Sequence, residues 1–550
     1  MTETSIFLDI TGFFCYNKHM EATVEIPLST MERLQNQITE MSDLIAKQTA
    51  LLQYYEAQFR LLKRRQFGAS SERVETDDYR QLTLFGDAEI PLPPKPEIEE
   101  VTYNRKKRKG KREEDLSNLP VVRVDHELPA DKRDCPKCGK LMRDIGVTVR
   151  REIDIIPAQA ILKEHAVHTY SCPDLACVEA EGSVTFVKAD APKPLITGSL
   201  ASPSLVAHIA YQKYSNGMPL YRIEKGFQYD GVNISRQNMS NWVIKCVELY
   251  LITIYIMLKT HLLKESVLHG DETTIQVLHE AGRTAQTKSF EWVYRTSGHS
   301  DRKIVIYEYQ ETRKQEHPRE FLKNFKGFLH CDGYQVYHNL PPEITVVGCW
   351  AHARRYFEKI WKTLPKKARE ESDAGIGLSY INALFKFERE FVELPPNKRY
   401  QKRLEKSKPV ADAFFAWADA LGALPNFPLG QATHYAMSQR KYLENVFLDG
   451  RLELSNNRCE RSVKPFVMGR KAWLFSNTPE GANASSVMYS IIETAKENGL
   501  HPFCYVRFLL EALPNMTSAD NFEELLPWSG LLPDWCRVPG KHKPVDNGNP

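Results

Sequence analysis

The sequence lacks the features of a secreted, membrane-spanning or uniformly charged protein. Its most apolar run, Tyr250–Leu258, is nine residues long, well short of the roughly 18 that a membrane span requires. Lys and Arg number 73 against 70 Asp and Glu, so the net charge of +3 excludes a histone-like chain and limits any nucleic-acid contact to local surfaces. An acidic start, with Asp9 interrupting the first apolar stretch, is unlike a signal peptide. Eleven cysteines, an odd number in 550 residues, do not fit a disulfide scaffold, and we expect a reducing, cytoplasmic compartment.

The N-terminal part predicts a coiled-coil helix followed by a linker. Residues 1–27 match no pattern. Residues 28–66 carry a heptad, which predicts self-association, with a helix packed on its own protein as the alternative. Residues 67–118 are rich in proline and then basic, with seven basic residues in positions 105–112, and are typical of a linker. That basic run is either a solvated tether or an arm that contacts DNA phosphates. The heptad positions are Met31, Leu34, Ile38, Met41, Ile45, Gln48, Leu52, Tyr55, Phe59 and Leu62.

Two cysteine pairs predict a structural zinc site within residues 119–190. Cys135 and Cys138 are separated by two residues, and Cys172 and Cys177 by four. Two tight thiolate pairs on turns supply the tetrahedral ligand set that structural Zn²⁺ prefers. The segment between the pairs, at residues 147–167, is rich in β-branched residues and fits a hairpin. We interpret this region as a zinc ribbon, with four buried thiols as the alternative.

Residues 195–262 are expected to form a helical DNA-binding domain. Pro203 begins one helix that ends at Gly217, residues 219–229 form a second that ends at Gly231, and Ser235 caps a third. Short helices joined by tight turns are typical of a helix-turn-helix unit, although a plain helical linker is an equal alternative. The start of the third helix carries side chains of the types that read base edges, namely Arg236, Gln237, Asn238 and Asn241.

From residue 263 the pattern changes to strands. Over residues 263–352 the expected order is three strands, a helix, a strand, a helix or loop, and a strand, which is typical of a ribonuclease-H-like fold. Residues 353–454 are too long for a loop and predict a helical insertion, residues 455–515 complete the core, and 516–550 are a C-terminal segment. The fold class is therefore a multidomain α+β protein. The five strands are expected at 267–278, 290–295, 303–310, 327–335 and 345–352, and the helix at 318–325.

Three acids are candidates for a catalytic metal site. Asp271 lies in the first strand and Asp332 at the end of the fourth, and these strands are neighbours in the expected topology. A carboxylate in a half-buried strand is costly unless it is paired or binds metal. Glu460 is the third acid, on a short helix that Ser455 or Asn456 caps and Pro465 ends. Glu272 is the rival of Asp271, but it points to the opposite face of the strand.

Oxygen ligands of this kind suit Mg²⁺ or Mn²⁺, and two such ions can hold the attacking and leaving oxygens of a phosphodiester. Arg461, Arg470 and Lys471 are candidate phosphate contacts, with Arg458 and Lys464 beside them. His352 either orients water or DNA or satisfies a local backbone group. Trp350 and Trp473 either stack on bases or pack in the core, which is the commoner fate of tryptophan.

Several long motifs, in order, give the chain a resemblance to a known family. It resembles the insertion sequence 66 (IS66) family of bacterial DDE transposases over roughly residues 28–515. Compared with the family pattern, the second cysteine pair is wider and Ser455 stands where Asp is common. The motifs are Phe67-Gly-Ala-Ser-Ser-Glu-Arg73, Gly270-Asp-Glu-Thr-Thr, Cys331-Asp-Gly-Tyr, Gly348-Cys-Trp-Ala-His-Ala-Arg-Arg355, Asn456-Asn-Arg-Cys-Glu-Arg461, Gly469-Arg-Lys-Ala-Trp-Leu-Phe475 and Tyr489-Ser-Ile-Ile-Glu-Thr-Ala-Lys-Glu-Asn-Gly499.

The resemblance implies a DNA transposase whose catalytic triad is Asp271, Asp332 and Glu460. It also implies the domain order of zipper, zinc-binding segment, helical DNA-binding region and ribonuclease-H-like core with a helical insertion. Double-stranded DNA is the expected partner, and the resemblance implies two small companion proteins encoded by the same element. The rival interpretations are a nuclease of the same fold that cuts without joining, a catalytically inactive zinc-containing DNA-binding protein (a domesticated transposase or repressor), and a coiled-coil scaffold.

Overall fold

The computed structural model describes residues 159–171, 186–517 and 519–539, with a few isolated positions before residue 154. The predicted basic run, the four zinc cysteines and, apart from Met41, the heptad segment lie outside these described residues. Strands β1 (Thr169–Ser171) and β2 (Phe186–Lys188) pair antiparallel on either side of the second cysteine pair. The hairpin expected at 147–167 is wrong for its described part, because residues 159–167 form no strand and the side chains of Ile161 and Leu162 are exposed instead of packed as in a sheet.

Three helices follow as the turn residues predict. They are α4 (Pro203–Ala210), which continues through the π-helical turn η2 (Tyr211–Ser215), α5 (Leu220–Tyr229) and α6 (Arg236–Cys246). Gly217 and Gly231 have positive φ angles of 68° and 77°, which glycine adopts at little cost. The Ser235 hydroxyl accepts the Asn238 N–H at 3.2 Å, which confirms the predicted cap.

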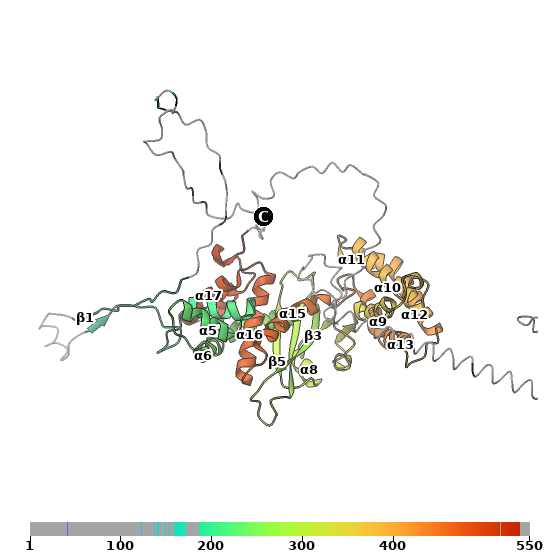
Figure 1. The fold of residues 1–550 in the computed structure, drawn as a ribbon, viewed down its shortest axis with the longest axis horizontal. Helices are drawn as coiled ribbons and strands as arrows, with labels where there is room; N and C mark the ends of the chain where they lie inside the picture. Colours follow the sequence, from blue (N-terminus) through green and yellow to red (C-terminus); the bar gives the residue numbers. More distant parts are fainter. Residues whose placement is uncertain are drawn as a thin grey trace, which may run out of the picture. The chain divides into compact units, whose positions relative to one another are not determined.

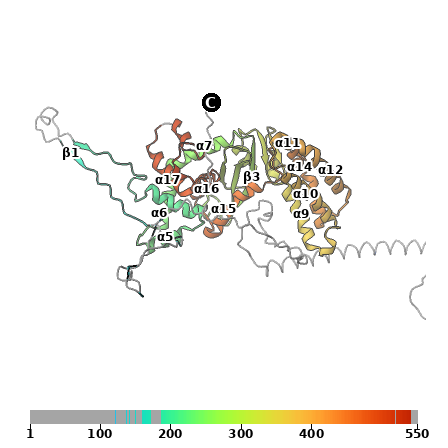
Figure 2. The ribbon, with the colours of Figure 1, turned by 90° about the horizontal axis from the view of Figure 1, so that it is seen from above.

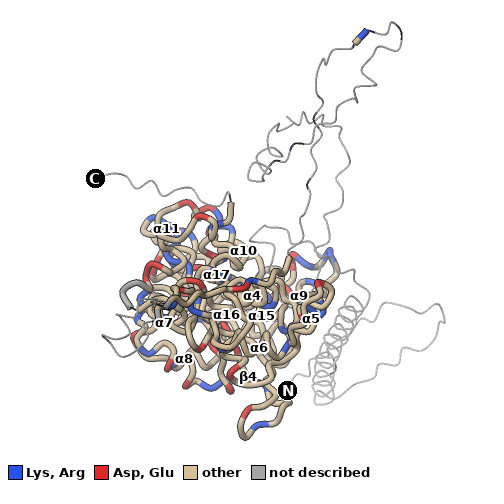
Figure 3. Tube along the Cα trace, turned by 90° about the vertical axis from the view of Figure 1, so that its left-hand side faces the viewer, with Lys and Arg blue, Asp and Glu red and all other residues tan. Residues whose placement is uncertain are grey.

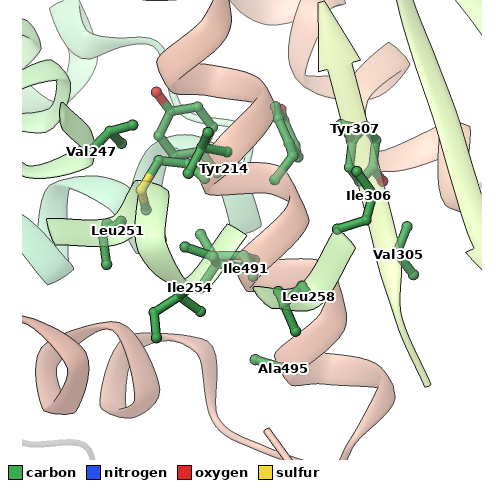
Figure 4. Packing of buried hydrophobic residues seen from close by; sticks show 14 of the residues in the cluster. Tyr214, Val247, Leu251, Ile254, Leu258, Val305, Ile306, Tyr307, Ile491 and Ala495 are labelled. Atoms are coloured by element: carbon green, nitrogen blue, oxygen red, sulfur yellow. The ribbon is translucent and has the colours of Figure 1, made fainter. Parts of the chain in front are cut away.

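Helix α6 runs on through η3 (Val247–Leu251) into α7 (Ile252–Leu262). This stretch, Arg236–Leu262, is the one helix among the described residues that is long and apolar enough to cross a membrane. Its buried side chains, including Leu251, Ile254 and Leu258, pack against β5 (Val305–Gln310) and α16 (Pro479–Glu497). Figure 4 shows this contact, and core packing accounts for the apolar face.

A five-stranded mixed sheet forms the centre of the fold (Figure 1). Its strand order is β5-β4-β3-β6-β7, with β3, β4 and β5 antiparallel and β3, β6 and β7 parallel. The predicted neighbourhood of the first and fourth strands is therefore confirmed. The bounds are β3 (Val267–Gln276), β4 (Lys288–Thr296), β5 (Val305–Gln310), α8 (Glu316–Phe321), β6 (Gly327–His330), η4 (Gln335–Asn339) and β7 (Ile344–Val347).

The fourth and fifth strands end earlier than the pattern predicts. Asp332 lies two residues past β6, and His352 lies inside helix α9 (Trp350–Thr363). Both corrections have the same cause: after the last hydrogen bonds between β6 and β7, the backbone leaves the sheet and bonds to other segments. The Cys331 N–H still bonds to the Val347 carbonyl at 3.1 Å, but the Gly348 N–H bonds to Tyr442 in the helical region.

Side chains from neighbouring helices form hydrogen bonds with backbone groups of both edge strands of the sheet. On edge strand β5, the Thr494 hydroxyl accepts the Val305 N–H at 3.0 Å, and the Ser490 hydroxyl accepts the Tyr307 N–H at 2.8 Å. On β7, the Asn445 amide donates to the Val346 carbonyl at 2.8 Å. These contacts remove the unpaired backbone groups of an exposed edge.

Residues 350–448 are almost entirely helical and have their own core, in which Trp350 and Phe357 pack against Phe414. Figure 2 shows these helices grouped beyond β3. Their bounds after α9 are η5 (Lys366–Ala368), α10 (Asp373–Glu390), α11 (Pro396–Lys402), η6 (Arg403–Ser407), α12 (Lys408–Ala420), α13 (Pro428–Ser438), α14 (Arg440–Leu443) and η7 (Glu444–Leu448). The remaining elements are α15 (Asn457–Trp473), α16, α17 (Pro502–Ala512), η8 (Leu513–Asn515), η9 (Ala519–Leu525) and η10 (Asp534–Cys536).

Helix α15 does not end at Pro465, as the sequence predicts, but continues to Trp473 with the proline inside it. A mid-helix proline removes one backbone hydrogen bond. The turn after it is held by packing, because Phe466 is buried against Tyr489 and Trp473. Gly469 allows this approach, since a Cβ there would lie 2.4 Å from the Tyr489 hydroxyl. Tertiary contacts therefore override the local proline signal.

Candidate active site

Asp271 and Asp332 are brought level by the register of two parallel strands. β3 and β6 pair His269 with His330, and continuing this register by two residues aligns Asp271 with Asp332. Neighbouring strands lie about 4.8 Å apart. Each aspartate accepts a backbone N–H: Glu272 N donates to Asp271 Oδ1 at 2.9 Å, and Tyr334 N donates to Asp332 Oδ1 at 3.0 Å.

Glu460 reaches the same place from α15, which packs along β3 and β4 (Figures 1 and 2). Burial and the negative charges of Glu272, Asp332 and Glu460 raise the pKa of Asp271 well above its ordinary value. Carboxylates that interact in this way lie close together. The structure thus brings together side chains that are 61 and 128 positions apart in the chain.

A basic residue absent from the predicted site, Arg355 of α9, contacts the third acid. Its Nη2 lies 2.5 Å from Oε1 and 2.7 Å from Oε2 of Glu460. Burial alone would lower the pKa of Arg355, but the Glu460 carboxylate outweighs it and the pKa is raised. A sequence signal existed, because Arg355 follows His352 by three positions and so shares its helix face.

His352 lies beside this ion pair. Its Nε2 is 3.0 Å from Nη1 of Arg355 and 3.8 Å from Oε1 of Glu460. Burial and the Arg355 charge lower the pKa of His352, which favours the neutral ring. His352, Cys349 and Glu460 each present one ligand atom, and these atoms lie within 4.8 Å of one another, a set that could hold a metal ion. The sequence predicts that His352 either orients water or DNA or satisfies a local backbone group, and its position beside Glu460 favours the first role.

Glu272, the rejected rival of Asp271, is a second acid that sequence reasoning left without a role. Its side chain is 2% exposed, and Arg313 Nε donates to its Oε1 at 2.8 Å. The Tyr337 hydroxyl donates to Oε2 at 2.7 Å. Burial and Asp332 raise the pKa of Glu272, while Arg313 opposes this change. Glu272 is therefore a paired, buried acid at the border of the cluster.

Asn456 joins the start of α15 to the strand that carries Asp271. Its Nδ2 donates to the Gly270 carbonyl at 2.8 Å, and its Oδ1 lies 3.0 Å from Nδ1 of His269. Its backbone N–H donates to the Cys349 sulfur at 3.2 Å. The sequence predicts that Ser455 or Asn456 caps this helix. Asn456 does occupy the N-cap position, but its side chain makes these buried contacts and does not cap the helix.

The side chains predicted to contact DNA differ in their surroundings. The four at the start of α6, Arg236, Gln237, Asn238 and Asn241, are exposed, as is Lys471. Arg470 is half-buried and donates to the Thr273 and Thr274 hydroxyls at 3.2 and 3.0 Å. Figure 3 shows basic and acidic positions interspersed along the described chain. Arg461 and Lys464 are partly buried along α15.

Three other predicted contacts are engaged elsewhere. Arg458 pairs with Glu453 at 2.8 Å. Trp350 is fully buried, and its Nε1 donates to the Leu443 carbonyl, so base stacking is wrong for this residue. Trp473 packs edge-to-face on Phe466, with ring centroids 5.6 Å apart. Core packing is thus the role of both tryptophans.

Four family models match stretches of this chain. The family model "Transposase IS66 family" matches residues 198–484, and "IS66 C-terminal element" matches 490–528. The "zinc-finger binding domain of transposase IS66" matches 132–174, which includes Cys135, Cys138 and Cys172 and stops short of Cys177. "Transposase C of IS166 homeodomain" matches 54–124. These matches support a structural zinc site and DNA as a partner.

Curated relatives match along most of their length. "Uncharacterized protein y4qI" of Sinorhizobium fredii is 28% identical, with 92% of this chain and 93% of the relative covered. "Uncharacterized protein y4jD" of the same organism is 26% identical, with 90% and 97% covered. Because the first family model spans more than half of the 550 residues, the chain belongs to the IS66 transposase family.

Proposed function

We propose that this protein is a DNA transposase that cuts DNA at the ends of its insertion sequence and joins the freed 3′ ends to target DNA. The observation that carries the proposal is the convergence of Asp271, Asp332 and Glu460 from β3, the end of β6 and α15. The strand order, with an antiparallel meander followed by two parallel strands, supports a ribonuclease-H-like core with residues 353–454 as its helical insertion.

The carboxylates fit a divalent metal site. Asp271 is buried among negative charges that raise its pKa, so a bound cation would relieve their repulsion. Carboxylate oxygens are hard ligands of the kind that Mg²⁺ and Mn²⁺ prefer. We propose Asp271, Asp332 and Glu460 as the residues that hold the metal. Such ions supply charge stabilisation at the phosphorus and lower the pKa of a bound water.

The proposed reaction has two steps. In the first, the oxygen of water forms a bond to phosphorus, the 3′ oxygen leaves as a hydroxyl, and the phosphate stays on the 5′ side. In the second, that 3′ hydroxyl attacks a target phosphodiester, and the target's own 3′ oxygen leaves. Neither step needs a covalent protein–DNA intermediate. We propose that Arg355, which contacts Glu460 through one nitrogen, moves to a DNA phosphate during the reaction.

The other parts of the chain have proposed roles in binding. We propose that the start of α6 reads base edges and that Arg461, Arg470 and Lys471 contact phosphates. Cys135, Cys138, Cys172 and Cys177 are proposed zinc ligands, and residues 28–66 a self-association helix. Two small companion proteins are proposed to assist the reaction in the cytoplasm. The domain bounds given above stand as part of this proposal.

The test uses full-length protein, Mg²⁺ or Mn²⁺, and labelled DNA that carries the element's own ends. Wild type is compared with Asp332→Asn and with Asp412→Asn, a matched change at an exposed acid that pairs with Lys408 on α12. We expect metal-dependent 3′ nicking and joining in wild type and Asp412→Asn, and neither in Asp332→Asn. Cutting without joining, even with companions added, would favour a nuclease. Binding with no cutting in any variant would favour the inactive DNA-binding protein.

A further inference from the structure

The turn that follows α15 combines backbone strain with exposed apolar side chains. Leu474 has φ 69° and ψ −51°, and it is the one non-glycine residue with positive φ in the part of the chain that the structure describes. The Phe475 N–H donates to the Trp473 carbonyl at 2.9 Å, which closes a γ-turn around Leu474. A γ-turn of this hand is rare and strained.

Contacts on both sides hold the strained turn in place. The Leu474 N–H donates to the Arg470 carbonyl at 2.7 Å, and the Ser476 N–H donates to the Gln276 carbonyl at 2.9 Å. The Leu278 N–H then returns to the Ser476 carbonyl at 3.0 Å. Strain of this kind persists only where the surroundings enforce it, and it concentrates at sites that bind ligands.

The turn presents apolar groups to solvent. Leu474 is 63% exposed and Phe475 43%, and Met468, nearly two helical turns before Leu474, is 69% exposed. A strained turn that stabilised the core would bury these side chains. These apolar side chains are exposed instead, which indicates a binding surface.

The charge of this segment favours DNA as the partner. Residues 461–479 contain four basic residues and no acid, and Arg470 and Lys471 directly precede the turn. The same strand and helix that carry Asp271 and Glu460 both lead to this point. From Glu460 to Leu474 is 14 helical residues, about 21 Å, and from Asp271 to Gln276 is about 17 Å along the strand.

We propose that Leu474 and Phe475 form an apolar wedge that unstacks a base step of bound DNA, about five or six base pairs from the phosphodiester that is cut. Apolar side chains that enter DNA between flanking phosphate contacts unstack and kink the duplex in this way. The spacing follows from the distances above and a rise of about 3.4 Å per base pair. This inference rests on the proposed function for where the DNA lies.

The test places 2-aminopurine at successive positions of the element's terminal duplex, since its fluorescence rises when stacking is lost. We expect a rise at one step within about ten base pairs of the cut end on binding of the full-length protein. Leu474→Ala with Phe475→Ala should abolish the rise. Asp332→Asn should keep the rise and lose cleavage, so that failure of the wedge and failure of the proposed chemistry are distinguishable.

A matched pair at one position separates strain from side chain. Leu474→Gly removes both, because glycine adopts positive φ freely, and it should raise the melting temperature by a few degrees while abolishing the fluorescence rise. Leu474→Ala keeps the strain, so it should lose the rise at an unchanged melting temperature.

Three results would overturn the wedge. Wild-type cleavage with no fluorescence rise at any position is one, and a rise that survives Leu474→Ala with Phe475→Ala is another. Dissociation of an oligomer by these changes, seen by analytical ultracentrifugation without DNA, would assign the turn to a protein contact instead.

Discussion

Replacing Arg355 with glutamine should make metal binding tighter in the absence of DNA. In the structure, one nitrogen of Arg355 contacts both carboxylate oxygens of Glu460, so a metal ion must displace it or share the carboxylate. The two side chains are 28% and 10% exposed, which lies between a surface ion pair of about 0–1 kcal/mol and a charged hydrogen bond of about 1.5–3 kcal/mol. Removal of a competing contact of about 1.4 kcal/mol lowers the Mn²⁺ dissociation constant about tenfold.

The measurement is an electron paramagnetic resonance titration of free Mn²⁺ against wild type, Arg355→Gln and Arg354→Gln. Arg354 is the matched control, because it lies one position earlier on α9 and pairs with Glu358 at 3.0 Å. Arg354→Gln should bind Mn²⁺ as wild type does. Arg355→Lys should also stay close to wild type, since a single nitrogen makes the contact. With DNA bound, Arg355→Gln should cleave more slowly. Equal Mn²⁺ affinities for wild type and Arg355→Gln would refute the competition.

Three further changes test the surrounding fold. Burial raises the pKa of Glu291 to about 8 from 4.5. The contribution of Glu291 to stability is therefore present below about pH 4.5 and is lost as the pH rises through 8. Glu291→Gln should have a higher melting temperature than wild type between about pH 6 and 9, and a difference that does not depend on pH would contradict this cause. Thr494→Val, which removes the hydroxyl bonded to Val305, should lower the free energy of unfolding by about 1–3 kcal/mol, whereas Thr260→Val on the exposed side of α7 should change it little in the same thermal melt. Asn456→Leu leaves the Gly270 carbonyl without its donor and should abolish cleavage while filter binding to DNA persists, and full cleavage by this variant would show that the anchor is dispensable.

The elements that local pattern controls could be predicted from the sequence. Ser235 caps α6, and Gly217 and Gly231 mark helix ends, because each acts through its own backbone and the next few residues. The three meander strands are long enough for their apolar alternation to be clear. The placement of Asp271 beside Asp332 needed only the assumption that their two strands are parallel neighbours, which the pairing confirms.

The features that the sequence did not predict arise from contacts between segments that are distant in the chain. Pro465 by itself predicts the end of a helix, but α15 continues beyond it because Phe466 packs on Tyr489. Asn456 reads as a cap, yet β3 takes its side chain. The spacing of Arg355 from His352 indicates only a shared helix face; its acidic partner lies 105 residues later, and only the folded chain brings α9 and α15 together.

The charges of the site explain why arginines belong to it. The structure pairs each glutamate with a guanidinium, Glu460 with Arg355 and Glu272 with Arg313, and gives each aspartate a backbone N–H. Four carboxylates in a half-buried cluster would otherwise repel one another strongly. The arginines lower that repulsion while the protein is free of metal and DNA. In the proposed reaction a cation would take the carboxylate and a phosphate would take the freed guanidinium. On this reasoning the resting ion pair of Arg355 and Glu460 couples metal binding to DNA binding, because each ligand satisfies the charge that the other releases.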